Sequence, residues 1–129
     1  MTTDLWMLVW STVLCLSIPL VGVASVAQSA GGFPWALGNR DTPNELPLYG
    51  QRAQRAHANM VENLAPFAVL VLVAQVSGNA NAATATGATI FFWSRVAHAA
   101  VYTVGIPYVR TLAFGASIWG EIQILTQLF

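Results

Sequence analysis

The chain has 129 residues, of which 56% are hydrophobic and 8% are charged, and its formal net charge is zero. This composition is far from that of a soluble globular domain, and the lack of any basic run argues against a nucleic-acid-binding protein. No charged residue occurs within 5–39 or within 63–94, and both stretches exceed the roughly 20 residues that cross a bilayer as a helix. We therefore expect a single membrane-embedded domain over residues 1–129.

The first apolar run, residues 5–26, predicts the first transmembrane helix. Its end, from Ser25 to Ala27, resembles the cleavage site of a signal peptide. The residues before the run include Asp4 and no basic residue, however, whereas a signal peptide starts with a positively charged region. We therefore expect the run to remain in the protein. The one cysteine of the chain, Cys15, lies in this run, so an intramolecular disulfide is excluded.

Residues 28–50 differ in composition from the rest of the chain, because they are rich in Gly, Pro and Asn. Pro43 and Pro47 interrupt regular structure, so we expect one long loop here. Trp35 and Tyr49 suit a position at the membrane surface. Long loops in compact folds tend to carry function.

The second helix is predicted from residue 48 or 50 to residue 76, and its first half is unusually polar. At about 100° per residue, one arc of about 80° collects residues spaced i, i+3, i+7, i+10 and i+14. His57 projects from nearly the opposite side of this helix. A polar stripe in an apolar chain needs partners, either on other helices or on a polar ligand. The stripe consists of Arg52, Arg55, Asn59, Glu62 and Pro66, of which the proline is expected to kink the helix or remove a backbone hydrogen bond.

Three interpretations of this stripe are open. Arg52 can be a topogenic residue that flanks a helix and extends to the lipid headgroups. Glu62 can form a buried ion pair with Arg95 or Arg55 and thereby fix how the helices pack. Alternatively, several arginines build an anion-binding site that faces the cytoplasm, in which Asn59 and Glu62 contact an ammonium or amide group. Such contacts suit a small zwitterionic peptide such as glutathione, although composition alone does not name the ligand.

The third helix is expected over about 83–104. The preceding residues 77–81 read Ser-Gly-Asn-Ala-Asn and predict a tight turn, so the second and third helices should be antiparallel neighbours. Small residues at the start of the third helix permit close helix packing. Near its end Arg95, His98 and Tyr102 follow at i, i+3 and i+7, so they share one face.

The chain ends in a predicted fourth helix over residues 111–129, which Arg110 opens after a break at Gly-Ile-Pro, residues 105–107. The arginines gather at one end of the four helices, while the other end carries Asp4, an uncharged turn and the C-terminus. The positive-inside rule then places both chain termini outside the cell and the polar end in the cytoplasm. The expected fold is an all-α membrane protein, a four-transmembrane-helix bundle with N-out and C-out topology.

No metal site is predicted. His57 and His98 have no cysteine or carboxylate near them at a ligand spacing, and neither a Gly-rich phosphate loop nor a Ser-His-Asp order stands out. Glu121 is a lone carboxylate in the fourth helix. We expect it to be a hydrogen-bonded packing residue near the bundle axis or a group at the outer interface.

Nearly the whole chain resembles the MAPEG family, the membrane-associated proteins in eicosanoid and glutathione metabolism. The four-helix layout, the chain length and a specific motif in the second helix carry the resemblance. Some family members have tyrosine at the positions of Asn63 and His98, and catalytic members often have more basic residues in the first and third loops. The matching residues are Arg52, Arg55, Ala56, His57, Asn59, Glu62, Asn63, Pro66 and Phe67 in the second helix, Arg95, His98 and Tyr102 in the third, and Arg110.

The resemblance implies a homotrimer in which glutathione, bound as a co-substrate and without a metal, lies in a U shape between adjacent subunits near the cytoplasmic face. Arg110 matches the arginine that stabilises the glutathione thiolate in catalytic members, and Arg40 matches a basic residue at the end of the first helix. The residues implied to bind glutathione are Arg40, Arg52, Arg55, Asn59, Glu62, Arg95, His98 and Tyr102.

The activity implied is that of a membrane-bound glutathione transferase or peroxidase, which acts on hydrophobic electrophiles or lipid hydroperoxides. A nearby guanidinium favours the thiolate form of a thiol, which is the form that attacks an electrophile. The alternative is a non-enzymatic lipid-binding or accessory membrane protein with the same trimeric fold. In either case we expect a multi-pass protein of a bacterial inner membrane, surrounded by lipids and with no nucleic-acid partner.

Overall fold

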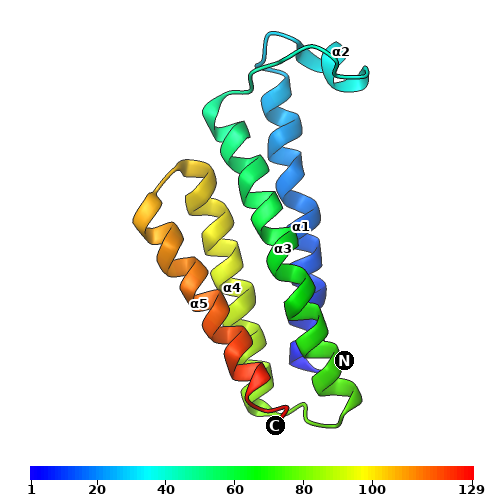
Figure 1. The fold of residues 1–129 in the computed structure, drawn as a ribbon, viewed down its shortest axis with the longest axis vertical. Coiled ribbons are helices and arrows are strands. Elements are labelled where there is room, and N and C mark those ends of the chain that lie inside the picture. Colours follow the sequence, from blue (N-terminus) through cyan, green and yellow to red (C-terminus); the bar gives the residue numbers. More distant parts are fainter.

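The computed structural model describes all 129 residues, and they form helices without any β-strand. Four long helices run up and down in a bundle, with both chain termini at one end (Figure 1). The expected all-α fold with four long helices is thus confirmed. The helices are α1 (Thr3–Val26), α2 (Gly32–Leu37), α3 (Leu48–Val76), α4 (Ala82–Val104) and α5 (Pro107–Leu125).

Two of these helices, α1 and α3, are long and apolar enough to cross a membrane, with mean hydropathies of 2.1 and 1.5. Large apolar side chains also cover the outside of the bundle, since Leu16, Val76 and Leu112 are at least 70% exposed. Apolar surface on this scale needs lipid or a neighbouring chain to cover it. The number of membrane crossings and the N-out, C-out orientation stay predictions.

The segment predicted as one long loop contains a short helix, α2, so the prediction was wrong over Gly32–Leu37. Proline is tolerated in a first helical turn, where its missing N–H would have no partner, and Pro34 occupies such a position. The rest of the segment folds back on this helix, because Trp35 Nε1 donates a hydrogen bond of 2.6 Å to the carbonyl oxygen of Thr42. The connection is therefore an ordered cap over the ends of α1 and α3 (Figure 1).

The last helix also begins earlier than predicted, at Pro107 rather than after Arg110, and it ends at Leu125 rather than Phe129. Gly105, with φ of 99°, ends α4 in the left-handed region, and Pro107 is preorganised for the first position of α5. Only two residues therefore separate the two helices. As a result, Arg110 lies in the first turn of α5, and its N–H donates to the Ile106 carbonyl oxygen at 3.3 Å.

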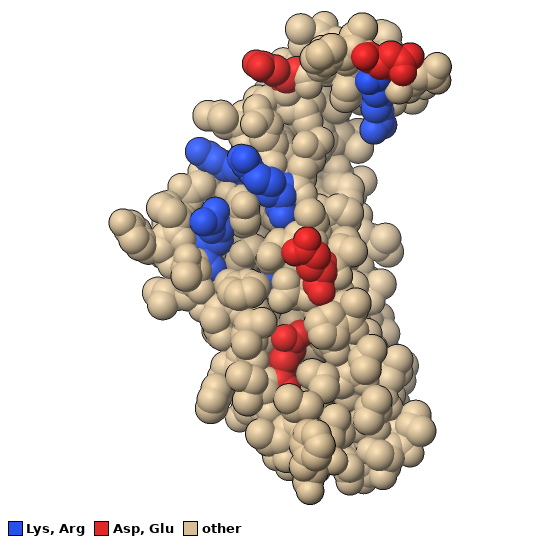
Figure 2. Space-filling model, in the orientation of Figure 1, with Lys and Arg blue, Asp and Glu red and all other residues tan.

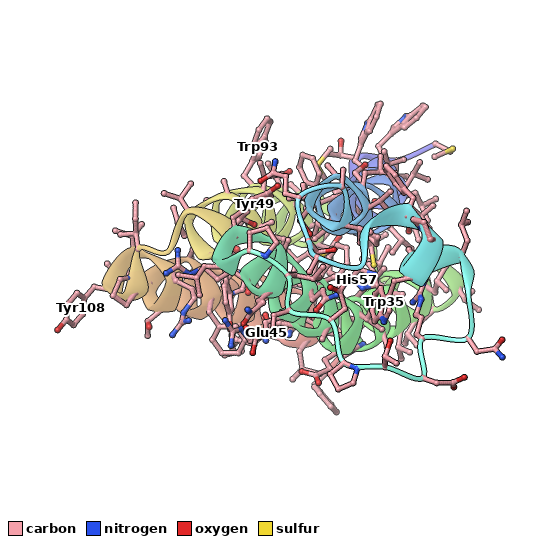
Figure 3. The ribbon with its side chains drawn as sticks, turned by 90° about the horizontal axis from the view of Figure 1, so that it is seen from above. Trp35, Glu45, Tyr49, His57, Trp93 and Tyr108 are labelled. Atoms are coloured by element: carbon pink, nitrogen blue, oxygen red, sulfur yellow. The ribbon has the colours of Figure 1, made fainter.

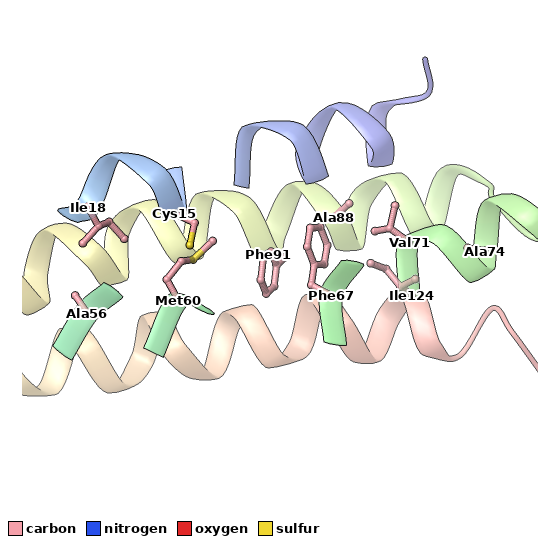
Figure 4. Close-up of a cluster of buried hydrophobic side chains, with 10 residues drawn as sticks. All are labelled: Cys15, Ile18, Ala56, Met60, Phe67, Val71, Ala74, Ala88, Phe91 and Ile124. Carbon is pink, nitrogen blue, oxygen red and sulfur yellow. The ribbon is translucent and has the colours of Figure 1, made fainter. Parts of the chain in front are cut away.

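The bundle consists of two helix pairs, α1 with α3 and α4 with α5, that pack on each other. The second pair is close because small residues meet: a Cβ added to Gly87 would lie 2.6 Å from the Gly120 carbonyl oxygen. This confirms the close packing expected from the start of α4. Between the pairs Phe67 of α3 stacks on Phe91 of α4 with ring centroids 3.8 Å apart, at the centre of the apolar core (Figure 4).

At the end that carries the chain termini, polar groups hold the α3–α4 turn. The Asn81 side chain accepts hydrogen bonds from the N–H groups of Ala83 and Thr84, at 2.7 and 3.2 Å, while Thr84 Oγ1 accepts from the Asn81 N–H. This is a capping box. The Thr84 hydroxyl also lies 3.2 Å from Asp4 Oδ2, which links α4 to the start of α1.

Candidate functional site

At the opposite end of the bundle, three arginines surround one cavity of about 350 Å³. Arg52 and Arg55 come from α3, and Arg110 comes from α5. Figure 2 shows arginine side chains gathered over this end of the molecule. Arg52 is held in place because its Nη1 donates a 3.0 Å hydrogen bond to the carbonyl oxygen of Val104, one of the last carbonyls of α4 that lack a helical partner. Arg52 therefore does more than flank a helix.

A second cavity of about 280 Å³ shares Tyr102 and Arg110 with the first. Asn59 of α3 and His98 of α4 also line it. The Arg110 guanidinium lies over the Tyr102 ring, 4.5 Å from its centre, which is a cation–π contact. The two cavities thus form neighbouring compartments on either side of this Arg110–Tyr102 contact.

Arg95 lies behind this second cavity and is only 1% exposed. Its Nη2 donates a 2.8 Å hydrogen bond to Asn59 Oδ1, and its Nε lies 3.4 Å from the sulfur of Met60. Its Nη1 is buried and has no hydrogen-bond partner. Because Asn59 Oδ1 accepts this charged hydrogen bond, the orientation of the Asn59 side chain beside the cavity is fixed.

Glu62 does not form the buried ion pair that the sequence suggested. Its side chain is exposed, and Arg95 donates to Asn59 instead. The physical reason is the direction in which α3 faces its neighbours. Met60 is fully buried against the core, and Glu62, two residues later, lies about 200° further around the helix. Glu62 therefore points away from the other helices of the chain.

Arg40 also lies away from the arginine cavity. It follows α2, its Nε donates to the Ala36 carbonyl oxygen at 3.1 Å, and its guanidinium lies 5.6 Å from the centre of the Trp35 ring. Together with His57 it lines a different, mostly apolar cavity of about 460 Å³ between α1, α2 and α3. His57 and Trp35 lie on this side of α3, whereas Tyr108 marks the far side, where α5 begins (Figure 3).

The structure thus brings together six of the nine predicted site residues around the two cavities, with Arg95 directly behind them. It leaves Arg40 and Glu62 apart from this group. Sequence reasoning missed Thr111 and Phe114, which line the second cavity. Both follow Arg110 on α5, so a correct start for α5 would have placed Phe114 one turn beyond Arg110 on the same face. The six are Arg52, Arg55, Asn59, His98, Tyr102 and Arg110.

This arrangement suits an anionic organic ligand. Guanidinium groups bind carboxylates through paired N–H groups, and no carboxylate side chain lines either cavity. The volumes are those of a small-molecule site rather than of a single ion. Nowhere in the chain do three or more side chains of histidine, cysteine, aspartate or glutamate gather as metal ligands would.

Comparison with known proteins identifies the family. The sequence model of the MAPEG family matches residues 5–126, which is nearly the full length of the chain. No curated protein matches the chain. The family match agrees with the helical bundle, with the two helices that are able to span a membrane, and with the cationic cavities between α3, α4 and α5. The chain therefore belongs to the MAPEG family, the membrane proteins of eicosanoid and glutathione metabolism.

Proposed function

We propose that this protein is a membrane-bound, glutathione-dependent transferase or peroxidase that acts on hydrophobic electrophiles or lipid hydroperoxides. The observation that carries the proposal is the position of Arg110. Its guanidinium borders both cavities, next to Tyr102 and within reach of whatever Arg52, Arg55 and Asn59 hold.

Glutathione fits the donor set of the site. It carries two carboxylates, one ammonium group, two amides and a thiol. Arg52 and Arg55 at the open cavity are suited to the carboxylates, and Asn59 in the next compartment is suited to an amide. Arg40 and Glu62 would act from a neighbouring protomer, since both are exposed in a single chain.

The proposed assembly is a homotrimer with α3 near the three-fold axis. Two observations support it: α3 exposes Arg55 and Glu62 in the protomer, and the outer surface of the bundle is widely apolar. Charged groups within a membrane face protein or water rather than lipid, so neighbouring copies are expected to cover this face. We further propose that all four long helices cross a bacterial inner membrane with both termini outside, because the arginines gather at the end of the bundle opposite the termini.

The chemistry begins with loss of the thiol proton. Arg110 and the positive end of the α5 dipole lie together at the start of α5, so both favour a thiolate in this cavity. In conjugation, the thiolate sulfur forms a bond to an electrophilic carbon, and the leaving group departs or the carbon chain takes up a proton. In peroxide reduction, two glutathione molecules are oxidised to their disulfide while the hydroperoxide becomes an alcohol and water.

The test uses the full-length protein in mild detergent. We expect it to be retained on immobilised glutathione, to be eluted by free glutathione, and to accelerate the reaction of glutathione with a hydrophobic aryl halide or a lipid hydroperoxide. Retention without any acceleration, for electrophiles and hydroperoxides alike, would favour the accessory or lipid-binding role. Absence of retention would contradict glutathione as the ligand.

A further inference from the structure

We propose that Glu121 is a proton store for the cationic site. It takes up the proton of the glutathione thiol and returns it to the alkoxide that forms when a lipid hydroperoxide is cleaved. This inference rests on the proposed function and deepens it, because it names hydroperoxides as the substrate class that the site serves best. Its basis is one buried carboxylate and the buried polar atoms without partners between this carboxylate and the second cavity.

Glu121 is a charged residue on the inner face of α5. Arg110, Phe114, Ser117 and Glu121 follow at i, i+4, i+7 and i+11, so they share one face of this helix, and Ser117 and Glu121 are buried. Glu121 is only 9% exposed, as a packing residue would be, but its Oε1 lacks the expected hydrogen bond. A buried carboxylate without a partner is costly, and an ionisable residue inside a membrane helix therefore indicates function.

Arg95 lies one turn away from Glu121 on the neighbouring helix. Gly120 packs so closely on α4 that an added Cβ would lie 2.9 Å from the backbone nitrogen of Phe91, so Glu121 is level with Phe91. Arg95 follows Phe91 by one turn, and side chains on a helix lean back toward its N-terminus. The Arg95 guanidinium is the charged group that acts on Glu121. No hydrogen bond joins Arg95 Nη1 to Glu121 Oε1, and both atoms are buried without a partner.

Polar groups continue from Arg95 to the second cavity. Asn59, which accepts the 2.8 Å hydrogen bond from Arg95 Nη2, lines this cavity. His98 lines it as well, and its Nδ1 is a third buried atom without a partner. Buried polar atoms that no protein group reaches are usually satisfied by internal water. We therefore infer that water molecules hydrogen-bonded to these atoms connect the position of the thiol with Glu121.

Beyond Glu121 the interior is apolar. Phe67 stacks on Phe91 with ring centroids 3.8 Å apart, and the fully buried Val71 and Ile124 lie on the far side of this stack (Figure 4). Hydrocarbon side chains cannot carry a proton through hydrogen bonds. A proton on Glu121 therefore leaves by the path on which it arrived, which is the behaviour of a store rather than of a channel.

The charges around Glu121 allow both of its protonation states. Burial disfavours the ionised carboxyl group, whereas a neighbouring guanidinium favours it. Arg95 is the only buried charge that α4 contributes besides the titratable His98, α3 buries no charged residue, and Cys15 of α1 lies near Arg95 rather than near Glu121. A thiolate that forms beside Arg110 adds a second negative charge to the interior. Coulomb repulsion between the two anions then favours transfer of the proton to Glu121.

The proposed steps balance in protons and electrons. The S–H bond of glutathione breaks, the sulfur keeps the electron pair, and the proton forms an O–H bond on Glu121. The thiolate attacks the outer oxygen of the hydroperoxide, so an S–O bond forms, the O–O bond breaks and an alkoxide leaves. The proton of Glu121 then passes back to the alkoxide, which becomes the alcohol. A second glutathione converts the sulfenic acid to the disulfide and water. A halide leaving group, in contrast, needs no proton.

The main experiment compares two reactions of the full-length protein in detergent, reduction of a lipid hydroperoxide and conjugation of an aryl halide. Glu121→Gln should lower kcat for the hydroperoxide about tenfold but kcat for the aryl halide less than about twofold, because only the alkoxide needs the stored proton. Glu121→Asp keeps a carboxyl group and should retain most of the hydroperoxide rate. Glu45→Gln removes an exposed carboxylate and is the control. Equal losses in the two reactions, or no loss in either, would overturn the proposal.

A second measurement uses the wild type alone and therefore does not depend on how the variants fold. Glutathione is added in weakly buffered solution, the ultraviolet absorbance gives the amount of thiolate, and an indicator dye gives the protons released. Fewer protons than thiolates should appear in solution, because Glu121 retains the difference. Release of one proton for each thiolate would overturn the role of Glu121 and leave the proposed function intact. Binding of glutathione without any thiolate would contradict the proposed function itself.

Discussion

The two sides of α3 differ in what they offer a ligand. Toward α4 and α5, Arg52, Arg55 and Asn59 face cavities with polar walls from both helices. Toward α1 and α2, His57 faces a larger cavity whose other lining is mostly apolar and whose single cation is Arg40. One helix thus carries a cationic half-site and an apolar half-site on different faces. In the proposed trimer, a site would take its cationic half from one protomer and its apolar half from the next.

The largest expected effect comes from Arg110, on the cationic side. Arg110→Ala should lower the rate of glutathione conjugation by about 100-fold, because it removes a charged donor from the developing thiolate. Steady-state kinetics at saturating glutathione measure this change. Tyr108→Ala is the matched control, since Tyr108 lies on the same helix, is 85% exposed and points away from the site (Figure 3). An equal loss of the conjugation rate in both variants would show that the rate depends on an intact start of α5 rather than on the Arg110 guanidinium.

A substitution of Arg95 tests whether the cationic side of α3 also stabilises the packing of α3 against α4. Arg95→Met should lower the free energy of unfolding by about 1.5–3 kcal/mol, since it leaves the Asn59 oxygen without its charged donor. Thermal or denaturant unfolding in detergent measures the change. Ser94→Ala alters the neighbouring residue on α4 and should be close to neutral. A fully stable Arg95→Met protein would contradict the role of the Arg95–Asn59 hydrogen bond.

Glu62 tests whether the exposed side of α3 is covered by another copy. Glu62→Ala should leave the unfolding of the protomer unchanged but weaken the trimer about tenfold, the loss expected for one hydrogen bond to a charged group at an interface. Native mass spectrometry over a dilution series measures assembly. Glu45→Ala removes an exposed carboxylate from the connection before α3 and serves as control. Detection of only monomers or dimers in the wild type would contradict the proposed trimer.

The smallest effect expected is that of Arg40, on the apolar side. Arg40→Ala should weaken glutathione binding two- to fivefold, the range for an exposed ion pair. Co-assembly with Arg110→Ala protomers sharpens the comparison. If each site takes one half from each of two protomers, some trimers mixed from Arg40→Ala and Arg110→Ala protomers contain an intact site, and activity at low glutathione concentration exceeds the average of the two variants. Activity that only averages the two variants would place the whole site within one protomer.

Three of the long helices, α1, α3 and α4, could be predicted from the sequence to within about two residues, whereas α5 begins and ends four residues earlier than predicted. The same reasoning failed at α2 and at the start of α5. The Gly, Pro and Asn content of residues 28–50 was interpreted as loop, and Pro107 as part of a break, whereas proline is compatible with a first helical turn. A proline in the sequence either interrupts a helix or occupies its first turn, and only the conformation of the surrounding backbone decides between the two.

The candidate site was partly predictable for a related reason. Helical periodicity places Arg52, Arg55 and Asn59 on one side of α3, and the structure directs that side to the cavities. Periodicity does not say where the core lies relative to the stripe. One interpretation of the sequence therefore gave Glu62 a buried partner, although Glu62 faces outward. Contacts between distant segments, such as Arg52 with Val104, depend on how the helices splay and have no local signal.

The left-handed Gly105 between α4 and α5 has a consequence for which sequences this site tolerates. A Cβ at this position would displace the Arg52 guanidinium from its hydrogen bond to the adjacent Val104 carbonyl oxygen. The positive φ of 99° adds a second penalty for any other residue. In a saturation mutagenesis screen we therefore expect Gly105, which has no side chain, to be about as intolerant of replacement as the arginines themselves. The shape of the cationic pocket thus depends on the backbone conformation at Gly105 as much as on the arginine side chains.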